Sequence, residues 1–141
     1  MKIRNIVILA ILAGLTIACA TQEIVKYEYR STTMMGKRTL TITKDSVISD
    51  YQGRASSNRV ARAITSEEWQ AIQESSEDVK LKKLAKLEAP TNERQTDASP
   101  YGVLLISTAD STYISASFDG YNAHEKLLPL MGQIKKLSAI K

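Results

Sequence analysis

Cysteine and histidine are almost absent from this chain, and their scarcity excludes several kinds of site. The 141 residues include one Cys and one His, so a single chain can form neither an internal disulfide nor a zinc site built from several Cys and His ligands. A strong charge of one sign is also missing, because 19 Lys and Arg are set against 15 Asp and Glu, for a net charge of +4. This mild, dispersed excess does not favour nucleic-acid binding. Length and composition indicate one globular domain.

The chain also lacks an uncharged run long enough to cross a membrane. Residues 6–18 (IVILAILAGLTIA) carry no charge, but they are only thirteen residues, whereas a spanning helix needs about 20. Lys2 and Arg4 precede this run and small residues end it, which is the pattern of a secretory signal peptide. We therefore expect residues 1–18 to be an export signal.

The only cysteine, Cys19, stands at the end of this run, directly after Thr16-Ile17-Ala18. This ending resembles the lipobox of bacterial lipoproteins, although Thr16 occupies the position where Leu is usual. The resemblance implies a diacylglycerol and an N-acyl chain on Cys19, a short tether over residues 19–22, and a location on the periplasmic face of the outer membrane. The alternative is ordinary secretion: Ala18-Cys19-Ala20 also fits a small-x-small cleavage pattern, which would release a soluble periplasmic protein starting at Thr21.

The first half of the remaining chain has the two-residue period of half-buried strands. Val25, Tyr27 and Tyr29 are expected on the inner face of the first strand, and Leu40 and Ile42 on that of the second. The β-branched and aromatic content supports this interpretation. The predicted strands are 24–30, 37–43, 46–52 and a candidate fourth at 59–64.

The period then changes to that of a helix. Thr65 and Glu68 form a capping box that predicts a helix over 66–76, with Trp69 and Ile72 pointing inward. A second helix is expected near 126–140, with Pro129 in its first turn. Its apolar stripe consists of Leu127, Leu130, Met131, Ile134 and Leu137.

Residues 101–107 and 111–118 are predicted to form a hairpin around Ala109-Asp110. The face with Leu104, Ile106 and Tyr113 is expected to be only partly buried. The pairing places six side chains on the face that the helices cover: Tyr101, Val103, Leu105, Ile114, Ala116 and Phe118.

The order of elements predicts an α+β domain over residues 23–141. Strands come first, then a helix, two strands and a helix, which indicates an antiparallel sheet of five to six strands with two helices packed on one face.

Arg94, Asp97, Asp119 and Tyr121 are the candidate binding residues. Extending the predicted strand pairing of this hairpin by one residue places Asp119 beside Pro100. The 94–97 loop and Asp119 should therefore meet at one end of the sheet. This end is either a recognition surface or a structural tie, in which Asp119 caps the turn into the last helix and Arg94 holds the loop by a charge-assisted bond.

Several loop and strand-end residues between Trp69 and Leu137 form a recognisable pattern. They are Ala89-Pro90-Thr91-Asn92, Arg94, Asp97, Tyr113-Ile114-Ser115 and Phe118-Asp119-Gly120. The pattern covers about half of the chain and resembles a class of small periplasmic lipoproteins of Bacteroidota-type bacteria. The layout of elements is also similar to that of emfourin-type metalloprotease inhibitors, which implies protease inhibition as an alternative function.

No arrangement of residues indicates catalysis. His124 has no nucleophile motif to serve, and an exposed histidine near a helix start is the simpler interpretation. We therefore expect a non-enzymatic protein with no cofactor beyond its acyl chains, which binds a partner protein in the cell envelope. The alternatives are a periplasmic protease inhibitor and a small-ligand-binding protein or hydrolase, which would need a deep polar pocket.

Two further segments each allow two interpretations. The four lysines Lys80, Lys82, Lys83 and Lys86 either face anionic lipid headgroups near the anchor or form a solvated helix face. Met34-Met35 is either an exposed contact loop or a turn that packs inward.

Overall fold

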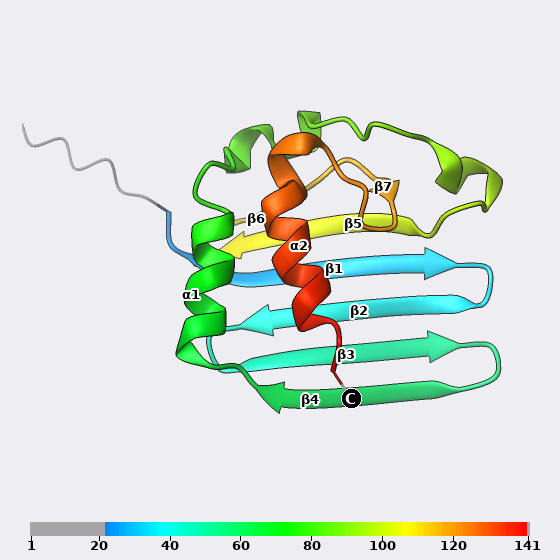
Figure 1. Ribbon diagram of the computed structural model, residues 1–141, viewed down its shortest axis with the longest axis horizontal. Coiled ribbons are helices and arrows are strands. Elements are labelled where there is room, and N and C mark those ends of the chain that lie inside the picture. The colour runs from blue at the N-terminus through cyan, green and yellow to red at the C-terminus, as the bar shows by residue number, and fades with distance from the viewer. Residues whose placement is uncertain (1–21, 141) are drawn as a thin grey trace, which may run out of the picture.

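The structure describes residues 22–140. In the first half of this range, segments with alternating apolar and polar side chains form four long strands. In this computed structural model they are β1 (Ile24–Thr33), β2 (Gly36–Thr43), β3 (Ser46–Gly53) and β4 (Ser57–Ala63). Each pairs antiparallel with the one before it, as Figure 1 shows. All four predicted strands are present.

The second half of the chain extends the sheet on the other side of β1. β5 (Tyr101–Thr108) pairs with β1, while β6 (Thr112–Ile114) and β7 (Phe118–Asp119) both pair with β5. The strand order is β4-β3-β2-β1-β5-β6, with β7 beside the first residues of β5. The predicted antiparallel sheet is confirmed, and it gains a strand because the second arm of the hairpin is divided into β6 and β7.

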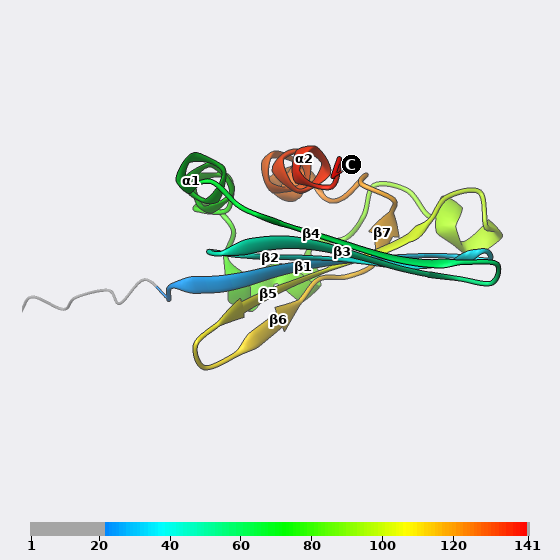
Figure 2. The ribbon, with the colours of Figure 1, turned by 90° about the horizontal axis from the view of Figure 1, so that it is seen from below.

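Two α-helices cover one face of this sheet (Figure 2). α1 (Ser66–Ser75) begins at the predicted capping box, in which Thr65 Oγ1 accepts from the Glu68 amide at 3.1 Å and the Glu68 carboxylate accepts from the Thr65 amide at 3.0 Å. α2 (Leu128–Leu137) carries Pro129 in its first turn, as predicted.

Three short 3₁₀ helices lie between the other elements of the described chain. η1 (Leu81–Lys86) lies against β6. η2 (Glu93–Thr96) falls within the segment predicted as a loop, and η3 (Glu125–Leu127) leads directly into α2.

The core lies between the sheet and the two helices. Trp69 is half-buried, and its ring meets that of Tyr27 edge-on, with the centroids 5.9 Å apart. The fully buried members are Tyr27, Leu40, Ile42, Val47, Ile72, Leu84, Leu104, Ile106, Leu130 and Ile134. The whole predicted stripe of the last helix, including Leu127, Met131 and Leu137, is buried here.

The predicted inward position of Val25 is wrong. The pairing of β1 with β5 shifts between Ile24 and Lys26, which leaves Val25 in a bulge with 43% of its surface exposed. Ile24 packs against the core instead. A bulge breaks the two-residue period locally, so the alternation that holds from Tyr27 onward does not extend back to Val25.

The predicted hairpin face is also wrong. Phe118 pairs with Gly102 rather than Tyr101, because Ser115 engages Leu104 through both its amide and its hydroxyl and the ladder shifts by one residue. The helices cover Leu104 and Ile106. Tyr101 and Ile114 lie on the open face, 49% and 52% exposed.

Candidate functional site

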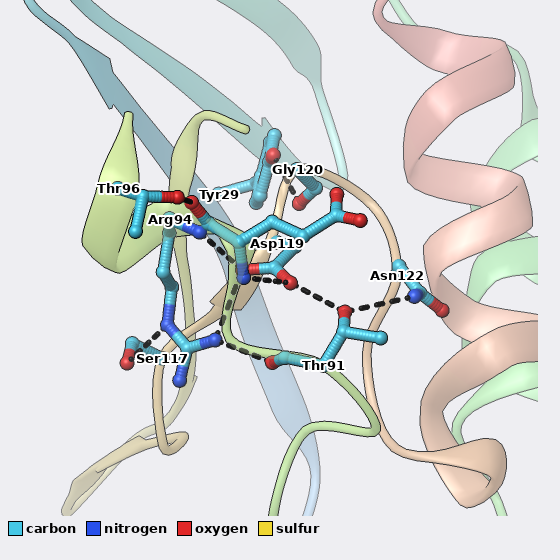
Figure 3. Close-up of polar contacts among 9 residues, drawn as sticks. Tyr29, Thr91, Arg94, Thr96, Ser117, Asp119, Gly120 and Asn122 are labelled. Atoms are coloured by element: carbon cyan, nitrogen blue, oxygen red, sulfur yellow. Dashed lines mark hydrogen bonds and ion pairs between the residues drawn. The ribbon is translucent and has the colours of Figure 1, made fainter. Parts of the chain in front are cut away.

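Asp119, the best connected of the candidate residues, lies at one end of the sheet. Figure 3 shows its carboxylate among donors from the 91–94 segment. It accepts from the Thr91 hydroxyl, from the Glu93 and Arg94 amides at 2.9 Å each, and from Arg94 Nη1 at 3.0 Å. These four donors occupy the lone-pair sites that a carboxylate offers.

Arg94 completes this arrangement from η2. Its Nε donates to Ser117 Oγ at 3.0 Å and its Nη1 to the Thr91 carbonyl at 2.7 Å. The side chains of Arg94 and Asp119 are only 9% and 3% exposed. We call the five residues Thr91, Glu93, Arg94, Ser117 and Asp119 the Asp119 node.

The node favours the ionised form of its carboxylate. Burial of Asp119 opposes ionisation, but the hydrogen bonds from Thr91, Arg94 and Glu93 outweigh it and hold the pKa of the carboxyl well below its usual range. The ion pair is therefore present throughout the neutral range.

This geometry favours the structural interpretation of Arg94 and Asp119. Both carboxylate oxygens of Asp119 and the Nε and Nη1 atoms of Arg94 are hydrogen-bonded within the chain, so the two residues tie η2 to β7. Asp119 caps the start of η2 rather than the turn into the last helix. That turn is capped by His124, whose Nδ1 accepts from the Lys126 amide at 3.2 Å.

Asp97 and Tyr121 do not join the node. Asp97 is exposed and ends η2 in the left-handed conformation, with φ 58°. Tyr121 packs its ring 4.8 Å from that of Tyr29, and its hydroxyl donates to Ser138 Oγ at 3.2 Å. Of the four candidates, only Arg94 and Asp119 are joined by a hydrogen bond.

The turn between β1 and β2 presents two exposed methionines. Met34 and Met35 are each 63% exposed, which favours the contact-loop interpretation over inward packing. Lys37 and Arg54 flank them and are also exposed. We call Met34, Met35, Lys37 and Arg54 the methionine tip.

Backbone bonds hold the methionine tip in a defined shape. The Arg54 amide donates to the Met35 carbonyl at 3.0 Å, which joins the β1–β2 turn to the β3–β4 turn. The Met35 amide donates to Thr33 Oγ1 at 3.2 Å. A side chain at Gly36 would lie 2.5 Å from the Gln52 carbonyl oxygen, so the two turns pack closely.

A shallow depression of about 380 Å³ lies beside these methionines. Its walls include basic and uncharged side chains and no acidic one: Thr32, Thr33, Met34, Gly36, Lys37, Gln52, Gly53 and Arg54. An apolar contact with an acidic border would complement this surface. The sequence predicts the turn at Met34-Met35 but does not show whether the two side chains are exposed.

The face of the sheet opposite α1 and α2 is more polar than the core face. Glu28 pairs there with Lys26 at 3.5 Å and with Arg30 at 2.5 Å. Leu105 is almost buried and Ile114 lies beside it on β6. This face therefore offers a narrow apolar strip next to paired charges.

A groove of about 430 Å³ lies between the end of α1 and the start of α2. Val79, Leu87 and Pro129 supply apolar walls, and acidic and basic side chains alternate around them. The charged members are Glu74, Asp78, Lys80, Lys83, Glu125 and Lys126. This is the pocket to which the small-ligand alternative would apply.

Cys19 and the predicted signal peptide lie outside the described residues. Between residues 22 and 140, no helix is both long enough and apolar enough to span a membrane. Within the same range, no group of three or more His, Cys, Asp or Glu side chains is arranged to hold a metal ion.

Comparison with known proteins adds no family assignment: no protein-family model matches the chain, and no curated protein matches it.

Proposed function

We propose that this chain is a lipid-anchored protein of the bacterial cell envelope that binds a partner protein through its methionine tip and is not an enzyme. The observation that carries the proposal is the exposure of Met34 and Met35, 63% each, on a turn whose backbone is held in place.

The direction of β1 supports this assignment. The strand begins at Ile24, five residues after Cys19, and ends at Thr33, immediately before Met34. Ten residues of extended chain span roughly 33 Å. An anchor on Cys19 would hold one end of the strand near the bilayer, and the methionine tip would project from the other end into the periplasm.

The chemistry of the tip supports a protein as the partner. Methionine side chains are flexible and polarisable, and they adapt to apolar surfaces of different shapes. Lys37 and Arg54 add positive charge at the border and form no ion pair within residues 22–140. The expected partner surface is an apolar patch with acidic residues around it.

Site-specific photo-crosslinking in intact cells tests the proposal. A photoreactive amino acid at position 34 or 35 should capture one discrete partner, and the same residue at Gln70, exposed on α1, should not. The double substitution Lys37→Glu with Arg54→Glu should abolish capture, since it reverses the charge of the border.

Equal capture from Gln70 and from the tip, or capture that charge reversal leaves unchanged, would contradict the proposal. The identity of the partner separates the alternatives: a metalloprotease would indicate an inhibitor, and a structural envelope component would indicate an adaptor.

A further inference from the structure

We propose that the lysines around η1 form a second binding surface, directed at the anionic phospholipid headgroups of the membrane that carries the anchor. This inference rests on the proposed anchor at Cys19. We call Lys80, Lys82, Lys83 and Lys86 the lysine patch.

The lysine patch is exposed and its charge is not neutralised by ion pairs. All four side chains are exposed, and none forms an ion pair with another residue in the 22–140 range. Five basic residues elsewhere in the described fold are paired, namely Lys26, Arg30, Arg59, Arg62 and Arg94. The lysine patch differs from the remaining unpaired basic residues in that its four members are close together in the chain and share surface grooves. Glu74, Asp78 and Glu125 share a groove with Lys80 and Lys83, and Glu77 shares another with Lys82. None of these carboxylates forms an ion pair with the patch, and η1 itself contains no acidic residue.

Local packing orients the patch outward. Leu84 is fully buried in the core, and Leu81 packs partly against it. These leucines fix one side of η1 against the core, so Lys82, Lys83 and Lys86 lie on its solvent side. The Lys83 amide donates a hydrogen bond to the Lys80 carbonyl at 2.8 Å, which stabilises the first turn of η1.

The described chain begins beside this patch. Gln22 lines a surface groove of about 570 Å³ together with Lys80, Lys82 and Lys83. Its side chain is also fixed to β6, because the Tyr113 hydroxyl donates to Gln22 Oε1 at 2.8 Å.

The spacing between Gln22 and the anchor brings the patch to the bilayer. Cys19 precedes Gln22 by three residues, which reach at most about 10 Å. That distance is close to the Debye length at physiological ionic strength, about 8 Å. A lipid on Cys19 would therefore hold the lysine patch where the field of anionic headgroups acts on it.

A single-chain anchor attached chemically makes the contribution of the patch measurable. The protein starting at Cys19 contains every described helix and strand, and its only thiol can be coupled to a maleimide that carries one myristoyl-length chain. One such chain gives only marginal membrane binding, so the second signal determines the outcome. Partition is measured by co-sedimentation with vesicles of phosphatidylcholine alone and with vesicles that also contain phosphatidylglycerol.

We expect the triple substitution Lys82→Gln, Lys83→Gln and Lys86→Gln to lower partition onto phosphatidylglycerol vesicles by roughly tenfold or more. Partition onto pure phosphatidylcholine should not change, and raised salt should remove the difference. The matched control is Lys37→Gln, Lys44→Gln and Lys136→Gln, which removes the same charge from exposed positions on other parts of the fold.

An equal loss in both triple variants would show a net-charge effect and overturn the assignment of the patch, as would no loss in either. Because the chain is coupled chemically, the outcome does not depend on whether a cell acylates Cys19. Failure of the proposed anchor is therefore detected separately, by the mass of the native protein.

Discussion

At the scale of single residues, Asp119 does the most to organise the end of the sheet. Its carboxylate accepts hydrogen bonds from two backbone amides of η2 and from the guanidinium of Arg94. Removing the charge would leave these donors facing a weaker acceptor inside a poorly hydrated node.

Asp119→Asn should therefore destabilise the domain, lowering Tm by roughly 5 °C or more. The matched control is Asp97→Asn, the same chemical change at an exposed left-handed position that asparagine tolerates. Thermal unfolding followed by circular dichroism checks both variants. Equal melting temperatures for the two would contradict a structural role for the node, and loss of partner capture by a fully stable Asp119→Asn protein would assign it to recognition.

Acid should destabilise the fold through the same residues. The Arg62 guanidinium and the Thr65 amide lower the pKa of Glu68 to about 2, and the pKa of Asp119 is also below its ordinary value. Both carboxyls are less readily protonated in the folded state, so their contribution is complete above about pH 4 and is lost as pH falls towards 2. Urea midpoints measured across this range should fall for the native protein and fall less steeply for Asp119→Asn combined with Glu68→Gln. Parallel curves would contradict this assignment.

The sequence predicts that the 94–97 loop and Asp119 meet at one end of the sheet, but it does not predict the individual hydrogen bonds of the Asp119 node. Counting along the hairpin placed Asp119 beside Pro100, which is wrong by one residue because Asp119 pairs with Tyr101. The preceding loop still lies at the same end of the sheet. The donors that matter most, the amides of Glu93 and Arg94, belong to η2. A single 3₁₀ turn has no periodic signal in the sequence.

At the scale of elements, two glycines make opposite contributions. A Cβ on Gly102 of β5 would lie 2.6 Å from the Gly120 carbonyl oxygen and 2.9 Å from the Phe118 ring. A Cβ on Gly132 of α2 would meet nothing within 4 Å.

Gly102→Ala should lower the free energy of unfolding by roughly 1–3 kcal/mol, because Phe118 and Gly120 lie too close to residue 102 to leave room for a methyl group. Gly132→Ala should raise it by about 0.5–1 kcal/mol, since alanine is the better helix former at an uncrowded position. Urea unfolding of both variants checks the pair. A neutral Gly102→Ala would mean that β7 does not pack against β5 in the manner described.

Elements with one apolar face were predicted correctly, apart from the bulge at Val25, and the element with two apolar faces was not. β1 from Tyr27 onward, β2 and α2 each have one clear apolar side. β5 has Leu104 and Ile106 on one face and Val103 and Leu105 on the other, so its period cannot tell which face meets the helices. Tyr27 and Tyr29 of β1 decide it, because they lie beside Ile106 and Leu104 in the sheet and face the core. Because β1 is distant from β5 in the sequence, the residues of β5 alone do not show which of its faces the helices cover.

At the scale of the whole molecule, the described fold has two distinct ends. Gln22 and the lysine patch lie at the end where β1 begins, and the methionine tip lies where β1 finishes. Figure 1 shows the turn between β1 and β2 at the opposite end of the sheet from the start of β1. An anchored protein with this polarity would contact the membrane at one end and a partner protein at the other.

The state of Cys19 underlies both proposals. The intact mass of the mature protein, isolated from envelope membranes with detergent, tests it most directly. We expect a chain that begins at Cys19 and carries the added mass of a diacylglycerol and an acyl chain. We also expect a Cys19→Ala variant to be missing from the membrane fraction. An unmodified chain that begins at Thr21 and is recovered without detergent would contradict it.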